Sequence, residues 1–456
     1  MHQDIDKIKA KRLINDISSI DTLDIVMNEI LKLTPIKNID DIDSVSIDSF
    51  WNNGEKELAM HKIHAYPAKF PAFITSKALV YYHQEYGNYP ESIADIFCGC
   101  GTVALEASRK NIDFWGCDIN PVATLIAKTK SSIYNCNSLK RYYRRICADA
   151  RNNNSHIIPY TEANERIQYW YQPKQYEDLY RLLESIRSNT TKGKYRCFFE
   201  CAFSNILKPT SRWLTKSIKP QIDPDKVCGD VFYEFEKQFK IMFRANEENL
   251  SLNDVRITHK PRIERKNVLT LRERKNKINM IVTSPPYVTS YEYADLHQLS
   301  SIWLGYVDDY RVLRNGSIGS DYQNSLSKDR NLKYLNDEGK RIVNALREKD
   351  HAKARVVEKY FLDMENVVNV CHKILSENGI ILFVIGDTEY KGVKIKNSHH
   401  LAKSLMDQGF EVSATRRKIT RKILTPYRDS RGMFTTDESS RQVYNEEYIL
   451  IGRKID

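Results

Sequence analysis

The sequence predicts an α/β fold with a doubly wound, mostly parallel sheet and a helical insertion domain. Three observations support this prediction. Short apolar runs alternate with segments of helical periodicity, which is the pattern of a parallel sheet covered by helices. A glycine-containing turn follows the first run and an acidic residue ends the second, at the positions where such sheets bind ligands. Helical periodicity over residues 131–265 then separates the second strand from the third.

The first strand, residues 93–97, runs into the turn Cys98-Gly99-Cys100-Gly101-Thr102 and the helical pattern of residues 103–107. Glycines allow the backbone to approach a ligand closely, and the N-terminus of the helix favours a carboxylate. A dinucleotide site is the alternative interpretation of such a turn. It is the weaker one, because Ala104 stands where G-x-G-x-x-G requires its third glycine.

The second strand, residues 114–118, ends in Asp118. An acidic residue at the end of the second strand of a βαβ unit is well placed to accept hydrogen bonds from ribose hydroxyls. The strand therefore adds a nucleoside-binding side chain to the carboxylate-binding turn.

A third apolar run, residues 278–283, ends in Ser284-Pro285-Pro286-Tyr287. Two successive prolines restrict the backbone and remove two N–H donors, so the loop holds its acceptors rigidly. A hydroxyl and a carbonyl beside an aromatic ring suit the exocyclic amino group of a flipped-out base. The structural alternative is a strand followed by a Pro-Pro turn and a buried tyrosine.

In the same order along the chain, these segments resemble the motifs of the DNA amino-methyltransferases that use S-adenosyl-L-methionine. Residues 95–101 resemble the first cofactor motif, D-x-F-x-G-x-G, and residues 64–70 resemble the segment that closes over the methionine part of the cofactor. The resemblance covers residues 60–130 and 265–456. It implies cofactor contacts from Tyr66, Pro67, Ala68, Lys69, Phe70, Asp95, Phe97, Gly99, Gly101, Thr102, Asp118, Ile119 and Asn120.

The resemblance also implies that Ser284, Pro285, Pro286 and Tyr287 are catalytic, and that the sheet is a seven-stranded Rossmann-like methyltransferase sheet with an antiparallel last strand. In this family a serine in the first motif position goes mostly with cytosine N4, and aspartate or asparagine mostly with adenine N6. We therefore expect a site-specific DNA (cytosine-N4) methyltransferase of a restriction-modification or phage-defence system. Adenine-N6 methylation of DNA and N-methylation of RNA bases are the alternatives.

The residue types of the catalytic motif indicate a mechanism. The lone pair of an exocyclic amine is delocalised into the base, which makes the amine a poor nucleophile. Hydrogen bonds from its N–H groups to the Ser284 hydroxyl and the Pro285 carbonyl would expose that lone pair, while Tyr287 stacks on the base. Transfer is then a direct displacement that needs neither a metal nor a covalent intermediate. Cytosine-C5 methylation, which uses a Pro-Cys pair, is excluded because none of the 14 prolines precedes a cysteine.

Positive charge is concentrated in one part of the chain. Residues 131–280 contain 29 Lys and Arg against 17 Asp and Glu, whereas the whole chain has a net charge of +11. Such a confined excess is expected of a surface that follows the phosphates of double-stranded DNA. A solvated, lysine-rich helical insertion is the alternative. We expect residues 131–265 to be the target-recognition domain, with residues 306–355 as a second candidate.

The expected organisation has four segments. Residues 1–55 form a helical extension with an acidic linker, residues 56–130 the cofactor-binding half, residues 131–265 the basic insertion, and residues 266–456 the catalytic half of the methyltransferase domain. Further strands are predicted at residues 267–271, 379–386, 410–414 and 447–452, and helices at residues 356–375 and 399–408.

Nothing in the sequence indicates secretion or a membrane. It has no apolar run of 18 residues and no apolar signal segment at its N-terminus. The nine cysteines lack C-x-x-C spacing and are expected to be reduced thiols. We expect a cytoplasmic, DNA-associated protein of a bacterial or archaeal cell, with a cognate restriction endonuclease as a candidate partner.

Four other positions have two interpretations each. Asp295 either lines a pocket or lies on an acidic surface helix, and His297 is expected on a helix surface. Asp387 either belongs to the active site or caps the next segment. The basic loop with Arg421, Lys422 and Arg428 is either a phosphate clamp or a solvated hairpin.

Overall fold

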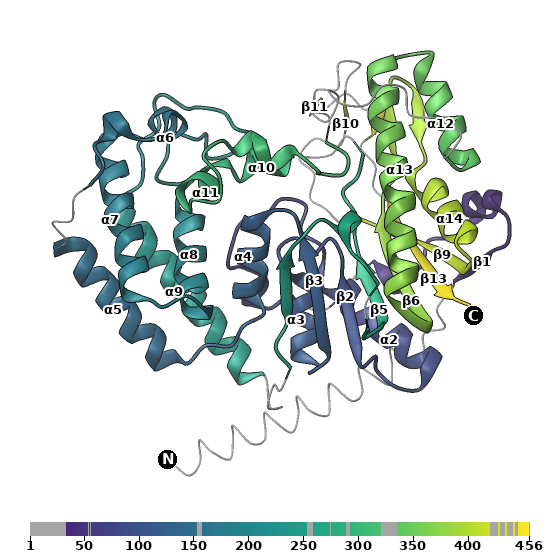
Figure 1. Cartoon of the computed structure of the whole chain (residues 1–456), viewed down its shortest axis with the longest axis horizontal. Coiled ribbons are helices and arrows are strands. Elements are labelled where there is room, and N and C mark those ends of the chain that lie inside the picture. The colour runs from purple at the N-terminus through teal and green to yellow at the C-terminus, as the bar shows by residue number, and fades with distance from the viewer. Residues whose placement is uncertain are drawn as a thin grey trace, which may run out of the picture.

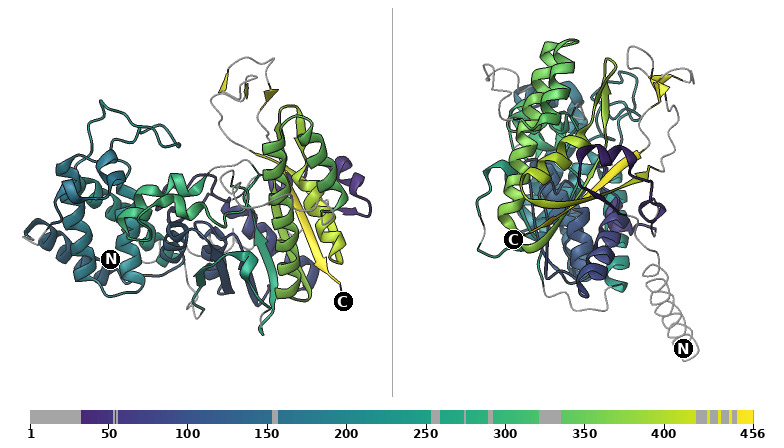
Figure 2. Two further views of the ribbon diagram at one scale, coloured as in Figure 1. Left: turned by 45° about the horizontal axis from the view of Figure 1, so that its top comes forward. Right: turned by 90° about the vertical axis from the view of Figure 1, so that its right-hand side faces the viewer.

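A computed structural model describes residues 33–52, 54, 56–152, 157–252, 259–273, 275–288, 292–320, 335–419, 427–428, 434–435, 441–442 and 446–455. Figure 1 shows a central sheet with a lobe of helices on one side and a group of C-terminal helices on the other. The views of Figure 2 show the same parts from two further directions.

The central sheet has eight strands in the order β1-β9-β13-β6-β5-β2-β3-β4. Neighbouring strands from β6 to β4 are parallel, and β13 is antiparallel to both β6 and β9. The strands are β1 (Thr34–Ile36), β2 (Ser92–Asp95), β3 (Asp113–Asp118), β4 (Arg262–Arg265), β5 (Ile278–Thr283), β6 (Leu375–Ile385), β9 (Phe410–Lys418) and β13 (Glu446–Lys454). The α/β fold and the antiparallel last strand are confirmed.

The predicted number of seven strands is wrong, because the N-terminal extension supplies an eighth. Strand β1 pairs with β9 at the edge of the sheet. The predicted acidic linker continues as the 3-10 helices η1 (Ile39–Ser44) and η2 (Ser49–Trp51), and the indole of Trp51 is fully buried. The described part of the extension therefore belongs to the fold. The helix predicted before residue 33 lies outside the described residues.

The strand predicted at residues 267–271 is also wrong. Asn267 accepts a hydrogen bond from the Leu269 amide and starts the 3-10 helix η5 (Val268–Thr270). The strand lies a few residues earlier, as β4, and pairs in parallel with β3. An edge strand of four residues with alternating exposure leaves too short an apolar pattern to stand out in the sequence. The last residues assigned to the insertion thus lie in the sheet.

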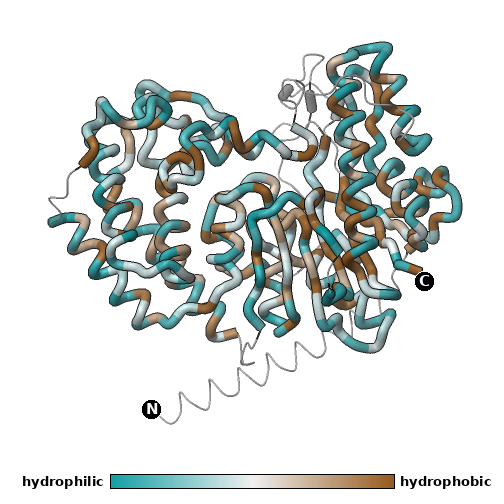
Figure 3. Tube along the Cα trace, in the orientation of Figure 1, coloured by the Kyte–Doolittle hydropathy of each residue, from teal (hydrophilic) through white to brown (hydrophobic). Residues whose placement is uncertain are grey.

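Helices cover both faces of the sheet. The helices α12 (Asp337–Arg347), α13 (His351–Ile374) and α14 (Asn397–Asp407) pack on one face, against alternate strand residues such as Ile281 and Ile381. The helices α2 (Ala72–Tyr86) and α3 (Thr102–Arg109) pack on the other, against the intervening residues Val282 and Leu382. Hydrophobic colouring in Figure 3 is accordingly dense along the central strands. Alternation of side chains across the strands builds these two cores.

The insertion forms a helical lobe with its own aromatic core. Its helices are α5 (Cys136–Asn152), α6 (Glu165–Trp170), α7 (Pro173–Asn189), α8 (Lys194–Ile206) and α9 (Val231–Ser251). Helix α4 (Pro121–Lys130), which follows β3, contributes Leu125 and Ile126 to this core. Helix α11 (Gln298–Trp303), which follows the catalytic motif, contributes Leu299 and Trp303. The lobe therefore packs against one helix that precedes it in the sequence and one that follows it.

The remaining described elements are short. They are η3 (Ala59–Lys62), η4 (Tyr160–Glu162), α10 (Tyr293–Leu296), η6 (Tyr310–Arg314), the β7–β8 hairpin (Thr388–Tyr390 and Val393–Ile395), and β10 (Tyr427–Arg428), β11 (Phe434–Thr435) and β12 (Arg441–Gln442). Among the described helices, none combines the length and the apolar character needed to cross a membrane.

Candidate active site

Three loops meet at the carboxyl edge of β5, β2 and β3, which are neighbours in the sheet. The hydroxyl of Thr283, at the end of β5, donates to Asp95 Oδ1 at the end of β2 over 2.7 Å. The amide of Gly99, after β2, donates to Asp118 Oδ2 at the end of β3 over 2.8 Å. The structure thus brings the glycine turn, the acidic residue and the catalytic motif together, as the sequence predicts for a parallel sheet.

The glycine turn requires both of its glycines. Gly99 has φ +48° and Gly101 has φ +78°, in the left-handed region that favours glycine. A Cβ at Gly101 would lie 2.6 Å from Ala127 of α4. Gly101 therefore lets α3 begin close against α4, with its free N–H groups at the mouth of the turn.

The Asp118 carboxylate is oriented by the backbone. Besides the Gly99 amide, the amide of Asn120 donates to its Oδ1 over 2.8 Å. Burial raises the pKa of Asp118 to about 6 despite these two hydrogen bonds. Each oxygen keeps a further lone pair, so the carboxylate can still accept from a pair of hydroxyls.

The N-terminus of α3 carries an unsatisfied polar atom. Thr102 is the first residue of the helix, and its buried Oγ1 has no hydrogen-bond partner among the described residues. Its hydroxyl and the first amides of α3 are donors that suit a carboxylate. With Asp118 nearby, the turn fits a molecule that has a ribose at one end and an amino-acid carboxylate at the other.

Only part of the predicted closing segment lies at the turn. The hydroxyl of Tyr66 lies 3.5 Å from the position a Cβ would take on Gly99. Lys69 instead forms an ion pair with Glu57 over 2.5 Å, and Phe70 packs against the core beneath α2. Tyr66 and Gly99 therefore lie together, and the ammonium group of Lys69 faces the carboxylate of Glu57.

Two further residues of the predicted cofactor set lie near the turn. Phe97 is half-buried and packs against the core under α13. Ile119 Cδ1 lies 3.3 Å from the position a Cβ would take on Gly316, in the segment after η6. The segment around Gly316 therefore approaches the residue that follows Asp118.

The sequence-based expectation for His297 is wrong. The side chain is buried, and its Nδ1 lies 2.8 Å from Asn120 Nδ2. Burial, with a smaller contribution from His64, lowers the pKa of His297 to about 3, so the ring is neutral. Its ring lies 5.2 Å from that of Tyr66, which also stacks on Tyr293. No periodicity marks this contact, because it joins three separate segments.

Strand β6 holds the first side chain of the catalytic motif. Ser284 Oγ donates to the carbonyl of Val384 over 3.0 Å. This bond orients the hydroxyl proton toward β6 and leaves the lone pairs of the oxygen for another donor. Pro285 is buried, and Pro286 and Tyr287 are half-buried. The motif is therefore a rigid loop with an acceptor hydroxyl and a partly exposed ring.

Comparison with known proteins agrees with this geometry. Residues 278–454 match the family described as "DNA methylase", N6_N4_Mtase. The chain is similar to the Type II methyltransferase M.MvaI of Kocuria varians, with 24% identity, 76% of this chain and 80% of that protein covered. It is also similar to the Type II methyltransferase M.BsoBI of Geobacillus stearothermophilus, with 24% identity and 53% of each chain covered.

The family match over residues 278–454 and the similarity to two Type II methyltransferases support a place among the S-adenosylmethionine-dependent DNA amino-methyltransferases. The same matches support S-adenosylmethionine as the cofactor. Among solved structures, the rRNA methyltransferase aviRa of Streptomyces viridochromogenes is similar, with 8% identity, a TM-score of 0.32, and 87% of this chain and 90% of that chain covered.

Three other positions in the methyltransferase have structural partners. Asp295 forms an ion pair with Arg314 over 2.7 Å. Asp387 accepts hydrogen bonds from the amide and the hydroxyl of Ser398 and so caps α14. Arg421, Lys422 and the side chain of Arg428 lie outside the described residues.

Asp95 makes the stability of the methyltransferase depend on pH. Burial raises the pKa of this carboxyl to about 7, far above its ordinary value of 3.8. The folded state therefore holds a proton that the unfolded state has released, and the resulting stabilisation is lost as the pH rises through about 7. Asp95→Asn should remove this dependence. The free energy of unfolding, measured with urea, should differ between pH 5 and pH 8. This difference should be roughly 2 to 3 kcal/mol smaller in the variant than in the wild type. Equal differences would contradict the raised pKa.

Proposed function

We propose that this methyltransferase modifies the exocyclic N4 of a cytosine flipped out of double-stranded DNA at a specific sequence. The observation that carries the proposal is the hydrogen bond of Ser284 to the Val384 carbonyl, which turns the lone pairs of the hydroxyl toward an incoming donor. An exocyclic amine is such a donor. The half-buried ring of Tyr287, three residues further along the motif, supplies a stacking surface for the base.

In the proposed mechanism the motif makes the amine nucleophilic. The two N–H groups donate to Ser284 Oγ and to the Pro285 carbonyl, which draws the nitrogen toward sp³ geometry and exposes its lone pair. When bound, S-adenosylmethionine supplies a methyl group on a positively charged sulfur. The new N–C bond forms as the C–S bond breaks, and one amine proton passes to solvent. The residues of the chain contribute by positioning the base.

The glycine turn orients the methyl donor in this proposal. Asp118 accepts from the ribose hydroxyls, and the N-terminus of α3 with the Thr102 hydroxyl binds the carboxylate. Tyr66 covers the turn at Gly99. Asp95 and Asn120, also in the predicted set, hold the loops: Asp95 accepts from the Thr283 hydroxyl and the Phe97 amide, and the Asn120 amide donates to Asp118.

The choice of cytosine N4 rests on Ser284, because a serine in the first position of the motif goes mostly with cytosine N4 in the family that the chain resembles. The test uses labelled S-adenosylmethionine, the purified protein and unmethylated genomic DNA, followed by digestion to nucleosides and mass spectrometry. N4-methylcytosine is the expected product. N6-methyladenine would keep the mechanism and change the base, whereas the absence of both would contradict the proposed reaction.

We also propose that the helical lobe recognises the DNA sequence, through a hairpin at residues 212–223. The Leu214 amide donates to the Gln221 carbonyl over 2.8 Å, and Lys208 Nζ braces the turn by donating to the Ser217 carbonyl over 2.7 Å. Lys216 and Lys219 are exposed at the tip, where no acidic residue occurs between 214 and 221. A short antiparallel hairpin with a basic tip suits the major groove of DNA.

Stacked tryptophans support this hairpin on the catalytic half. The ring of Trp213 stacks on that of Trp170, with centroids 5.0 Å apart, and Trp170 Nε1 donates to Gln298 Oε1 over 3.0 Å. Gln298 begins α11, which follows the catalytic motif. The hairpin is therefore fixed relative to the chain segment that carries the reaction.

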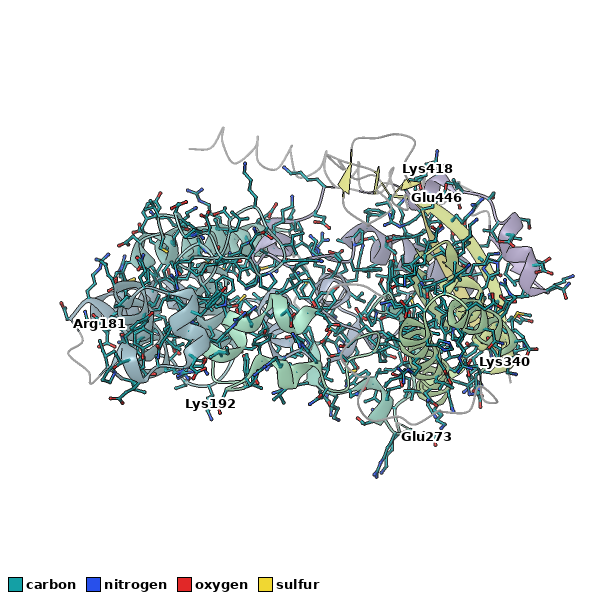
Figure 4. The ribbon with its side chains drawn as sticks, turned by 90° about the horizontal axis from the view of Figure 1, so that it is seen from above. Arg181, Lys192, Glu273, Lys340, Lys418 and Glu446 are labelled. Carbon is teal, nitrogen blue, oxygen red and sulfur yellow. The ribbon has the colours of Figure 1, made fainter. Side chains whose placement is uncertain are left out.

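The double variant Lys216→Ala, Lys219→Ala should bind DNA about 10-fold more weakly, and the slope of log K against log salt should fall by about 2, because two phosphate contacts are lost. Binding would be measured by fluorescence anisotropy at several salt concentrations. Lys192→Ala is the control. Lys192 is exposed before α8, at the opposite end of this ~20 Å helix from the hairpin, and Figure 4 shows it on the rim of the lobe. Equal slopes in the double variant and the control would contradict the assignment.

The similar proteins favour a role in protective DNA modification for this activity. The two similar proteins are Type II methyltransferases. We therefore propose that the enzyme acts on the DNA of a bacterial or archaeal cell, as the protective partner of a restriction endonuclease with the same recognition sequence.

A further inference from the structure

The hydroxyl of the stacking tyrosine is bonded to the last strand of the sheet. Tyr287 OH donates to Glu447 Oε1 over 2.9 Å, across a separation of 160 residues. Glu447 lies near the start of β13 and is 5% exposed. A buried carboxylate that accepts from a phenol is an unusual partner for a ring expected to serve only as a stacking surface, because burying a carboxylate is costly.

Arg417 holds this carboxylate in place. Its Nε and Nη2 donate to Glu447 Oε2 over 2.9 and 2.6 Å, and both side chains are almost fully buried. The two residues are direct partners in the antiparallel pairing of β9 and β13. The guanidinium also lies 5.6 Å from the ring of Phe73 on α2. The ion pair is thus held by the sheet and by the helix that covers it.

The same ladder of strands holds both side chains of the catalytic motif. Val384, which accepts from Ser284, is the pairing partner of Ile449 on β13, two residues beyond Glu447. Two adjacent strands therefore orient the hydroxyl that meets the amine and the ring that meets the base. Figure 4 shows Lys418 and Glu446 side by side where β9 and β13 reach this end of the sheet.

We propose that Glu447 is a positioning residue for methyl transfer, with Arg417 as its support. The Glu447 carboxylate fixes the rotation of the Tyr287 side chain, so that a flipped-out base meets a platform already in its working orientation. This inference rests on the proposed function of Tyr287. A platform that must be ordered during each encounter would bind the base with a larger loss of conformational entropy and would place the amine less accurately.

Tyr287→Phe tests the proposal most directly, since it keeps the ring and the ion pair and removes one hydroxyl. With saturating DNA and cofactor, its single-turnover rate should fall about 10-fold, while the dissociation constant for S-adenosylmethionine stays unchanged. Fluorescence of 2-aminopurine at the target position should show a less stacked flipped base. A wild-type rate in this variant would overturn the proposal.

Glu447→Gln completes a double-mutant cycle. Arg417 should take the single amide oxygen, so the NH₂ group faces Tyr287 and the original bond is lost. If Glu447 acts through Tyr287, the double variant should be no slower than the slower single variant. If instead the two substitutions lower the transfer rate by the product of their single effects, Glu447 has another role and the proposal is overturned. If Glu447→Gln lowers the unfolding midpoint too far to assay, the result of Tyr287→Phe decides alone.

Glu446→Gln is the matched control. Glu446 precedes Glu447 on β13 and forms a half-exposed ion pair with Arg416 over 3.2 Å, again between β9 and β13. This variant loses a cross-strand ion pair without touching the motif, and its transfer rate should equal that of the wild type. The wild-type protein separates the two proposals: if it methylates DNA and Tyr287→Phe is equally fast, only the positioning role fails, whereas an inactive wild type rejects the proposed function itself.

Discussion

Alanine at position 284 is expected to lower the rate of methyl transfer by about 100- to 1000-fold, the usual cost of removing one preorganised hydrogen-bonding group from a reaction centre. Ser284 Oγ is oriented by its bond to Val384, and alanine removes the oxygen that would accept from the target amine. Cofactor affinity should not change, since the glycine turn is intact. Single-turnover assays with labelled S-adenosylmethionine would measure the rate, and calorimetry the affinity.

Ser376→Ala is a control at the other end of the same strand pair. Ser376 Oγ donates from β6 to the carbonyl of Ile278 on β5 over 3.3 Å, so this substitution also removes a hydroxyl-to-carbonyl bond between β5 and β6. It should leave the transfer rate unchanged. A similar loss in both variants would indicate general damage to the sheet, and unchanged turnover in Ser284→Ala would reject the mechanism.

Alanine at position 118 should weaken the binding of S-adenosylmethionine by about 100-fold, with methyl transfer largely retained at saturating cofactor. Asp118 accepts from the Gly99 and Asn120 amides and presents its remaining lone pairs to the ribose, and hydrogen bonds to a charged group contribute about 1.5 to 3 kcal/mol each. Isothermal titration calorimetry would measure the change. Asp113→Ala, at the exposed start of the same strand, should bind as the wild type does.

The affinity should also depend on pH in a defined direction. With a pKa of about 6, Asp118 is ionised at pH 8 and gains a proton as the pH falls through 6. A protonated carboxyl accepts hydrogen bonds less strongly, so cofactor binding should weaken from pH 8 to pH 5 in the wild type, and less so in Asp118→Ala. Wild-type affinity in the variant at both pH values would remove Asp118 from the ribose role.

Several site residues were predictable because their roles depend on local chemistry. Gly99 and Gly101 occur where the backbone must adopt positive φ, and Asp118 ends a strand whose apolar pattern is clear. Other residues were missed because their partners are distant in the sequence. His297 lies in a short helical segment that indicates a surface, yet Asn120 and Tyr66 bury it.

The amino-acid sequence was enough to predict the α/β class, the position of most main strands along the chain, the glycine turn and the rigid Ser-Pro-Pro-Tyr loop. These features follow from side-chain periodicity and from the restricted backbones of glycine and proline, which act over a few residues. How the catalytic side chains are held is evident only in the folded chain. Ser284 is oriented by a carbonyl 100 residues away and Tyr287 by a carboxylate 160 residues away. Such contacts arise only when the strand order of the sheet brings β6 and β13 to the end of β5, and no local pattern in a single sequence encodes that order.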